Sequence, residues 1–436
     1  MKTMVGNQRT RLLFDKYLED LLTDYPVLET FEAAANSFVK HIDNTVHIWA
    51  ASRDWFLEPW GRDTFIALPG ILLTTGRYGE ARDVFRHFAS YEKGGLIPNR
   101  IRPNLIEYNT ADASMWFIQA IKSYLNYSND WAFIQEMLSV IRNIIDGYIM
   151  GTSYERFGKD ERIRMDERDG LIINPPQATW MDADPSGNRP VTPRYGKVVE
   201  INALWYSNLK FLATTEKHFN INSRKSNYYN SLAARVKVAF NEKLWNSEEN
   251  TLYDVIEGDP HGGAIRPNMV IAVSHGGDLL PQQRQIGVVR SALNDLLTPG
   301  GLRTLSPRDS NYYGEYNTYL PSDEKDLAYH QGTAWPWLMG PYSDALARVR
   351  LYEGKDENAI RCEIARNISP LVRFCMESPF KSLPEVFSGN PPYDPGGTSS
   401  QAWSIAEVLR VLVEYKLAKR AHRKKPREKS LTNTPR

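Results

Sequence analysis

The chain has 436 residues, of which 42% are hydrophobic and 24% carry charge, a composition typical of folded proteins with a large apolar core. This composition excludes a chain that is disordered over most of its length. No apolar run approaches the roughly 18 residues of a membrane-spanning helix, and charged residues interrupt the apolar positions of residues 1–22, unlike a secretory signal. We therefore expect a cytoplasmic protein without a membrane partner.

The net charge of +1 is distributed unevenly along the chain. Residues 416–429 contain eight lysines and arginines and one glutamate, which leaves residues 1–415 at −7 once Arg436 is also set aside. Nucleic-acid affinity depends on many cationic contacts to phosphates, so we expect no nucleic-acid partner for such a body. We interpret residues 416–436 as a basic, disordered tail; a tail that contacts nucleic acid or a membrane is the alternative.

Hydrophobic periodicity predicts helices along nearly the whole chain. A helix at 11–24 belongs to an N-terminal extension, residues 1–28, and the next helix spans 29–43. Four clear helical pairs follow: 62–75 with 78–93, 110–127 with 130–149, 199–217 with 224–244, and 331–352 with 355–377. A fifth pair, with a weaker pattern, lies within 268–296. A last helix spans 398–420.

Long irregular stretches rich in Gly, Pro, Asn, Asp and Trp separate these pairs, at about 50–62, 94–109, 170–198, 250–267, 299–330 and 379–399. Loops of this length are uncommon in compact domains unless they have a function. About twelve helices in six hairpins, with every long loop at one end, predict an all-α (α/α)6 toroid over residues 29–415. An open helical solenoid is the alternative, but a solenoid repeats with a fixed period and we find no such repeat.

Familiar cofactor and metal signatures are missing from the sequence. There is no P-loop and no G-x-G-x-x-G motif after a strand, and the eight histidines never adopt the close spacing of metal ligands. Cys362 and Cys375 fall in one predicted helix, too far apart for a disulfide, and we expect two free buried thiols. We therefore predict no cofactor and no metal.

Tryptophan is concentrated in the long loops. Eight of the eleven Trp residues lie there or in the first turn of the next helix, at positions 49, 55, 60, 116, 180, 335, 337 and 403. Aromatic faces beside Asp, Glu and Arg suit sugars, which offer apolar C–H faces and a ring of hydroxyls. The alternative is that these rings only brace the loops.

Four acidic residues in or beside these loops are candidates for glycosidic cleavage, which needs one protonated and one ionised carboxyl group. Asp182 has apolar neighbours, which we expect to desolvate it and raise its pKa, as a general acid requires. Glu385, which precedes a Gly turn, is the candidate base. Asp63 and Asp112 have similar contexts, although each also suits the first turn of a helix, where the dipole favours negative charge.

Long segments of the chain resemble the C-terminal amylo-α-1,6-glucosidase domain of glycogen debranching enzymes. They occur in order between about residues 50 and 413: PWGRDTFIALPGILLTTGRYGEAR, GLIPNR, EYNTADASMWF, TWMDA, TPRYGKVVEINALWYSNL, GGLRTLSP, AYHQGTAWPWLMGPY and PEVFSGNPPYDPGGTSSQAWSIAEVLR. The resemblance implies an (α/α)6 barrel, in agreement with the helix count.

The resemblance also implies an activity, inverting exo-hydrolysis of α-1,6-linked glucosyl residues at branch points of glycogen or limit dextrin, without metal or organic cofactor. Asp182 matches the general acid of the family's TWMD motif, and Glu385 matches its general base. Arg62 and Asp63 match the pair expected to hold the terminal glucose hydroxyls. Further motif residues expected to line the same pocket are Trp60, Asp112, Trp116, Trp180, Arg194, Lys197, Glu200, His330, Gln331 and Trp335.

Two departures from the family pattern bear on specificity. The toroid begins within about 30–50 residues of the first residue, so we expect neither the glucanotransferase domain nor the N-terminal β-rich domain of relatives, and no transferase activity. Ser388 stands where the family often has Asp, which leaves the base in place but affects how substrates are selected.

The expected partner is an α-glucan or oligosaccharide substrate; the sequence specifies no oligomeric state. An alternative function is that of a related toroid α-glucosidase acting on α-1,4 ends, as a glucoamylase does, or on a small glucoside such as glucosylglycerate. A non-catalytic glycan-binding protein on the same fold is a third possibility, which the presence of both candidate carboxylates disfavours.

Overall fold

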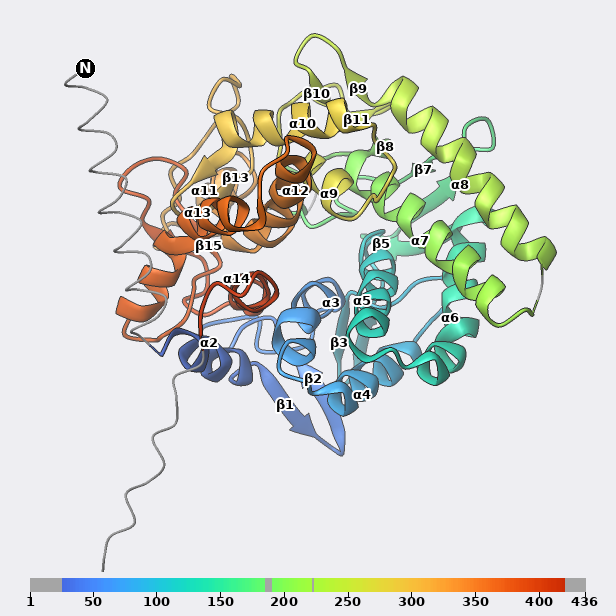
Figure 1. Cartoon of the computed structure of the whole chain (residues 1–436), viewed down its shortest axis with the longest axis horizontal. Helices are drawn as coiled ribbons and strands as arrows, with labels where there is room; N and C mark the ends of the chain where they lie inside the picture. Colours follow the sequence, from blue (N-terminus) through green and yellow to red (C-terminus); the bar gives the residue numbers. More distant parts are fainter. Residues whose placement is uncertain (1–25, 185–189, 222, 420–436) are drawn as a thin grey trace, which may run out of the picture.

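Two concentric layers of helices form a ring in the computed structural model, which describes residues 26–184, 190–221 and 223–419 (Figure 1). The inner layer comprises α3 (Gly61–Leu68), α5 (Ala113–Ser128), α7 (Val199–His218), α9 (Met269–Ser274), α12 (Met339–Tyr352) and α14 (Ala402–Glu414). Each inner helix contacts the next, and α14 packs against α3, so the layer closes on itself.

The outer layer comprises α4 (Tyr78–Ala89), α6 (Trp131–Met150), α8 (Ser223–Lys243), α10 (Gln282–Ser291), α13 (Glu357–Glu377) and α2 (Val27–Asn36). Five of these helices follow their inner partners along the chain. The sixth, α2, comes from the start of the described chain and packs against α14 from its end, which completes the six hairpins. The predicted toroid is therefore confirmed, including the weaker helical pair that forms α9 and α10.

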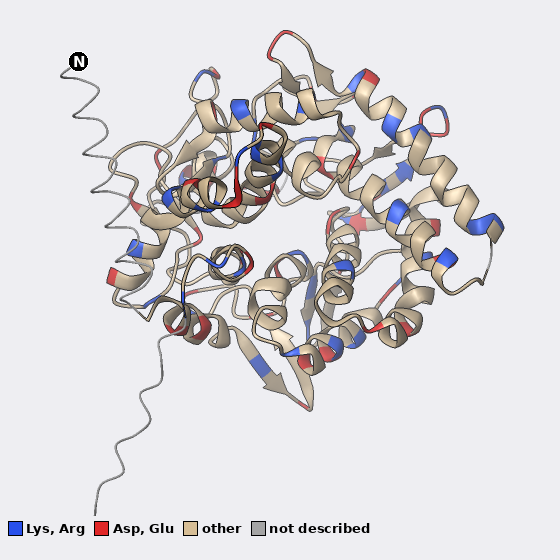
Figure 2. Cartoon of the chain, viewed as in Figure 1, with Lys and Arg blue, Asp and Glu red and all other residues tan. Residues whose placement is uncertain are grey.

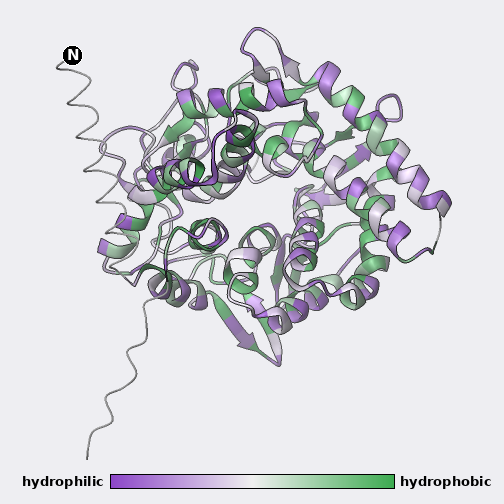
Figure 3. Cartoon of the chain, viewed as in Figure 1, coloured by the Kyte–Doolittle hydropathy of each residue, from purple (hydrophilic) through white to green (hydrophobic). Residues whose placement is uncertain are grey.

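The two layers differ in how much of each helix is buried. Every residue of α14 from Ala402 to Leu412 is buried, whereas α8 buries only one face. Hydrophobic residues accordingly gather on the inner side of the ring (Figure 3), and charged residues are frequent on outer helices such as α8 (Figure 2). A helix covered on all sides has no polar face, while an outer helix needs one for water.

The fold is mainly helical, as predicted, and short antiparallel strands lie between the helices. One sheet orders β12 (Leu297–Thr298), β13 (Gly301–Arg303), β14 (Ala334–Trp335), β15 (Val386–Phe387) and β16 (Pro395–Gly396), and another orders β5 (Thr152–Arg156), β6 (Lys159–Met165) and β7 (Ile172–Ile173). Two-stranded pairs join β1 (Val39–Ile42) to β2 (Thr45–Ile48), β3 (Arg100–Arg102) to β4 (Leu105–Glu107), β8 (Lys197–Val198) to β11 (Val255–Ile256), and β9 (Trp245–Asn246) to β10 (Thr251–Leu252). Most of these strands are too short to show the alternating pattern by which strands are recognised.

Local corrections follow from turn chemistry and helix geometry. The predicted helix at 29–43 ends at Asn36, because Asp43 and Asn44 adopt positive φ angles of 49° and 61° and turn the β1–β2 hairpin. The predicted loop at 299–330 contains a helix, α11 (Ser322–Tyr329). In α13, Cys375 is buried but Cys362 is exposed, because the two cysteines lie on different faces of that helix.

Two predicted segments lie largely outside the described residues: the extension at 1–28, except for residues 26–28, and the tail beyond residue 419. Among the described helices, none combines the length and the apolar character needed to cross a membrane.

Candidate active site

The end of the ring that carries the long loops holds a cavity of about 400 Å³. Seven predicted site residues line it: Trp60, Arg62, Asp63, Trp180, Asp182, Trp335 and Glu385. Seven further residues complete the wall: Ala50, Phe56, Asn109, Asp184, Tyr329, Gln401 and Trp403. The loops before α3, α7 and α14 thus converge on one cavity, as the positions of their carboxylates and tryptophans predict.

Arg62 links two of the predicted carboxylates. It begins the inner helix α3 with only 3% of its surface exposed, and its Nε donates to Asp112 Oδ2 at 2.6 Å while Nη1 donates to Asp182 Oδ2 at 3.0 Å. Burial alone would lower the pKa of Arg62, but the attraction of Asp112 and Asp182 outweighs it and raises the pKa. The buried Nη2 atom has no hydrogen-bond partner among the described residues.

The surroundings of Asp182 differ from the apolar ones that the sequence predicts. Its side chain is 31% exposed and forms an ion pair with Arg62. Its apolar neighbours are buried, Met181 completely and Trp180 as part of the cavity wall. The Asp182 carboxyl group is therefore partly exposed and paired with a guanidinium group.

Asp63 lies one residue beyond Arg62 in the first turn of α3, and its carboxyl group is buried. Burial raises its pKa to about 8; Arg62 opposes this shift, and the nearby carboxylates Glu385 and Asp182 increase it. Gln401 donates to Asp63 Oδ1 at 3.3 Å through its side-chain amide. The carboxyl groups of Glu385 and Asp182 are thus close enough to Asp63 to affect its pKa.

Glu385 is held at both carboxylate oxygens. The Tyr329 hydroxyl donates to Oε1, and the Thr398 backbone N–H donates to Oε2 at 3.2 Å. Burial raises the pKa of Glu385 to about 7, although these two hydrogen bonds oppose the shift. A carboxylate with a pKa near neutrality in a cavity wall is suited to take up a proton from water.

Gly397 is required beside Glu385. Its φ of +69° is unfavourable for other residues, and a Cβ atom at this position would lie 2.3 Å from Glu385 Oε2. Val386 pairs with Gly396 in the β15–β16 ladder, which fixes the register of the two loop segments. The glycine thus allows the backbone to approach the carboxylate closely enough for the Thr398 N–H to reach it.

Aromatic rings form much of the remaining wall. The rings of Trp180 and Trp335 meet edge to face with centroids 5.2 Å apart, and Trp403 packs against Trp335 at 5.6 Å. Trp60 lies beneath the guanidinium group of Arg100 at 4.5 Å and meets Phe56 edge to face at 5.6 Å. Each ring is fixed by its neighbours, so the cavity presents rigid apolar faces beside its carboxylates.

Seven predicted pocket residues do not line this cavity. Asp112 is the buried partner of Arg62. Arg194 and Glu200 form a buried ion network with Asp254: Arg194 Nη2 donates to Glu200 Oε2 at 2.6 Å, and Arg194 Nε donates to Asp254 Oδ2 at 2.6 Å. Since all three side chains are buried, they fix the loop before α7 rather than bind a sugar.

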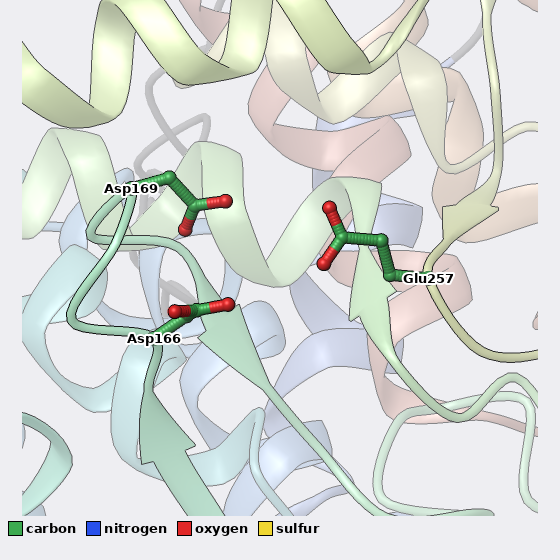
Figure 4. Close-up of side chains that lie close together, drawn as sticks. All are labelled: Asp166, Asp169 and Glu257. Carbon is green, nitrogen blue, oxygen red and sulfur yellow. The ribbon is translucent and has the colours of Figure 1, made fainter.

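Lys197 lies in a separate cluster. Its buried Nζ is 2.9 Å from Asp166, 2.6 Å from Asp169 and 2.6 Å from Glu257, and Lys243 contacts Asp169 and Glu257 from α8. The three carboxylates converge as metal ligands would (Figure 4). Lys197, Lys243 and Arg168 form ion pairs with these carboxylates, so the cluster ties together β6, β8 and the segment after β11.

The remaining three residues also have supporting positions. Trp116 lines another cavity farther along the inner helices, toward their C-terminal ends. His330 is fully buried and stacks on Trp335, with ring centroids 5.3 Å apart. Gln331 accepts a hydrogen bond from Arg266 and donates to the carbonyl of Val191 at 3.1 Å, which anchors the segment that follows Asp182.

Tyr329 and Gln401 are cavity residues that the sequence prediction missed. Tyr329 belongs to the AYHQG segment, in which the sequence resemblance points to His330 and Gln331. The last turn of α11 points the tyrosine toward the cavity and its neighbour His330 into the core. Gln401 directly precedes α14. Its position at the end of a long loop is the sequence feature from which a place in the cavity could be predicted.

Comparisons with known proteins agree with this geometry. Residues 33–410 match the family described as amylo-α-1,6-glucosidase. The chain is 25% identical over 449 residues to the glycogen debranching enzyme of Saccharomyces cerevisiae, in an alignment that covers 81% of this chain and 29% of that enzyme. The chain thus spans less than a third of the length of this relative.

Solved structures share the fold at low identity. The GH63 mannosylglycerate hydrolase from Thermus thermophilus in complex with glucose aligns with a TM-score of 0.62 and 12% identity, over 88% of this chain and 99% of that one. The rhamnosidase from Klebsiella oxytoca with rhamnose bound aligns with a TM-score of 0.58 and 13% identity, over 90% of this chain and 64% of that one.

The family match extends from α2 to α14 and so includes all six hairpins and every loop that contributes to the cavity. A closed helical ring with paired carboxylates and aromatic rings at its loop end is what a glycosidase of this fold requires. This chain is therefore a glycoside hydrolase and belongs to the amylo-α-1,6-glucosidase family.

Proposed function

We propose that this protein removes α-1,6-linked glucosyl residues at branch points of glycogen or limit dextrin, with inversion at the anomeric carbon. Asp182 acts as the general acid and Glu385 as the general base. The observation that carries the proposal is that both carboxyl groups, from loops about two hundred residues apart, line one cavity with Arg62 and Asp63. Family membership and the similarity to the yeast debranching enzyme support the choice of linkage.

The proposed reaction divides the work between the two carboxyl groups. Asp182 gives a proton to the glycosidic oxygen as the bond to the anomeric carbon breaks, and Glu385 takes a proton from the water that attacks the opposite face. A bound glucosyl unit would cover the exposed part of Asp182 and take it out of water, as proton donation requires. Arg62 and Asp63 then contact the hydroxyls of the glucosyl unit.

The test compares three substrates: a maltotetraose that carries one α-1,6-linked glucosyl unit, linear maltodextrin, and glucosylglycerate. We expect the branched oligosaccharide to have the highest kcat/KM. Faster hydrolysis of maltodextrin or glucosylglycerate would overturn the branch assignment in favour of the alternative α-glucosidase. Proton NMR at early times shows which anomer of glucose is released. We expect β-glucose; release of α-glucose would exclude inversion.

A further inference from the structure

The segment between β16 and α14 contacts two of the carboxyl groups of the active-site cavity. Thr398 and Gln401 belong to this segment, and at most 1% of the surface of either residue is exposed. Gln401 lines the cavity, whereas Thr398 is not part of its wall. Any effect of the Thr398 side chain on a bound sugar must therefore pass through another residue.

Thr398 is fixed to the candidate base by its backbone. The Glu385 N–H donates to the Thr398 carbonyl at 2.9 Å, and the Thr398 N–H donates to Glu385 Oε2 at 3.2 Å. Neither hydrogen bond uses the threonine side chain, so its hydroxyl can serve another partner. The position of Thr398 is thus set by both the main chain and the carboxylate of Glu385.

The Thr398 hydroxyl makes its contact with the Gln401 side chain. Oγ1 donates to Gln401 Oε1 at 2.6 Å, within the range of a well-formed O–H···O hydrogen bond. An amide has one acceptor end and one donor end, so this contact directs Nε2 away from Thr398. Nε2 in turn donates to Asp63 Oδ1 at 3.3 Å. A chain of hydrogen bonds therefore runs from Glu385 through Thr398 and Gln401 to Asp63.

The backbone of Gln401 is held independently of its side chain. Its N–H donates to the Leu383 carbonyl at 3.0 Å, and Ala51 pairs with Gln401 in an antiparallel β-bridge. The next residue, Ala402, donates its N–H to the Ala50 carbonyl at 2.8 Å. Since these contacts use only the main chain, a substitution of the Gln401 side chain leaves them in place.

The two ends of this chain of hydrogen bonds have different tasks in the proposed reaction. Asp63 contacts the hydroxyls of the glucosyl unit, and Glu385 activates the water that attacks it. The rate depends on how accurately the water and the sugar face each other, and a displacement of about 1 Å can cost about 100-fold. A link between the group that holds the sugar and the base therefore serves the reaction as well as the stability of the fold.

We propose that Gln401 is a positioning residue: its amide, oriented by the Thr398 hydroxyl, holds the Asp63 carboxyl group in a fixed place relative to Glu385. This role rests on the proposed function, because that function makes Glu385 the base and Asp63 a sugar-binding group. A neutral amide suits the place, since a carboxylate would repel Asp63 and an ammonium group would compete with the sugar for it.

The test measures kcat and KM on the branched oligosaccharide and on α-glucosyl fluoride, which has the glucosyl unit but no leaving sugar. Thr398→Val deletes the hydroxyl but keeps the backbone N–H that reaches Glu385. We expect this variant to lower kcat about ten-fold on both substrates and to change KM by less than about three-fold, because the orientation of the bound sugar is disturbed more than its affinity. Thr398→Ser retains the hydroxyl and should keep kcat within about two-fold of the wild type.

A double-mutant cycle tests whether Thr398 acts through Gln401. Gln401→Leu should lower kcat at least as much as Thr398→Val does, and adding Thr398→Val to Gln401→Leu should cause no further loss. A second loss of about ten-fold would show that Thr398 acts by another route and would overturn the proposal. The double variant removes both partners of the buried hydrogen bond, so it should fold even if a single variant is less stable.

Thr215→Val is the matched control. Thr215 is also fully buried, and its hydroxyl donates to the Phe211 carbonyl within α7 at 2.9 Å, but it does not line the active-site cavity. This variant should lower the thermal unfolding temperature and leave kcat unchanged. The same behaviour in Thr398→Val would show that the hydroxyl only stabilises the fold, and the positioning role would be wrong.

The outcomes also separate this role from the proposed function. If the wild type hydrolyses the branched oligosaccharide and Thr398→Val leaves kcat unchanged, the positioning role is wrong and the proposed function stands. If the wild type hydrolyses only α-glucosyl fluoride, the proposed branch specificity is wrong, while a lower kcat of Thr398→Val on the fluoride still supports the link. If the wild type hydrolyses neither substrate, both proposals are contradicted.

Discussion

The Tyr329 hydroxyl donates a hydrogen bond to Glu385 Oε1. The tyrosine is the last residue of α11, a helix outside the six hairpins, while the glutamate directly precedes β15. Their contact joins the extra helix to the candidate base in the wall of the active-site cavity. It also stabilises the ionised carboxylate and so opposes the effect of burial on the pKa of Glu385.

This relationship predicts a pH dependence. Since Glu385 must be ionised to act as base, kcat/KM should fall as the pH drops below about 7. Tyr329→Phe removes a hydrogen bond that favours the carboxylate, so the acidic limb of the pH profile should move to higher pH. Profiles of kcat/KM over about pH 5–9 measure this, with Tyr316→Phe as control, because its hydroxyl donates no hydrogen bond to Glu385 in the described structure. An unmoved limb in Tyr329→Phe would contradict the role of the contact.

Two substrates with different leaving groups distinguish the role of the proposed acid from that of the proposed base. Asp182→Asn should lower kcat on the branched oligosaccharide by at least about 100-fold but retain much of the activity on α-glucosyl fluoride, because fluoride leaves without being protonated. Glu385→Gln should lower the rates on both substrates, since both need an activated water. Equal losses on the two substrates for Asp182→Asn would show that Asp182 is not the acid.

Asp63 should destabilise the free enzyme at alkaline pH. Its folded-state pKa, about 8, lies above the roughly 3.9 of an unfolded aspartate, so folding favours the protonated form and the wild type loses stability as the pH rises toward 8. Asp63→Asn removes this loss and should raise the free energy of unfolding near pH 9 by a few kcal/mol, with little change near pH 4. Urea unfolding at both pH values measures the difference; a stability gain independent of pH would contradict the assignment.

The Arg194 network should contribute far more to the free energy of unfolding than an exposed ion pair does. Asp254→Ala leaves the buried Arg194 without one of its two carboxylate partners and should cost about 3–5 kcal/mol of unfolding free energy. Glu136→Ala removes the partner of Arg86 in a pair whose side chains are 47% and 42% exposed, and should cost about 1 kcal/mol or less. Similar losses in the two variants, measured by urea unfolding, would argue against the structural role of the network.

The cluster around Lys197 should behave as an ion-pair site and not as a metal site. Lys197→Met removes the cation that contacts all three carboxylates and should lower the thermal unfolding temperature by several degrees, an effect of about 1 kcal/mol or more. Added Ca²⁺, Mg²⁺ or EDTA should not change the unfolding temperature of the wild type, because the ammonium group occupies the place of a cation. A rise with Ca²⁺ would show that a metal displaces it.

Much of the fold was predictable because helical periodicity is a local signal. The pairs that became α5 with α6 and α7 with α8 begin and end within a few residues of their expected positions. Strands of two residues, such as β14 and β15, carry no comparable signal, since pairing across the sheet and not sequence alternation defines them.

The sequence by itself determined the ring of hairpins, the loops that would meet, and the acidic and aromatic residues those loops carry. Only the tertiary structure decided which of these side chains face the cavity. Lys197 and Arg194 are paired by Glu257 and Asp254, acids 60 residues away in the chain, whereas Tyr329 turns toward Glu385. Burial and the nearest opposite charge set the role of an ionisable group, and both depend on packing between distant segments.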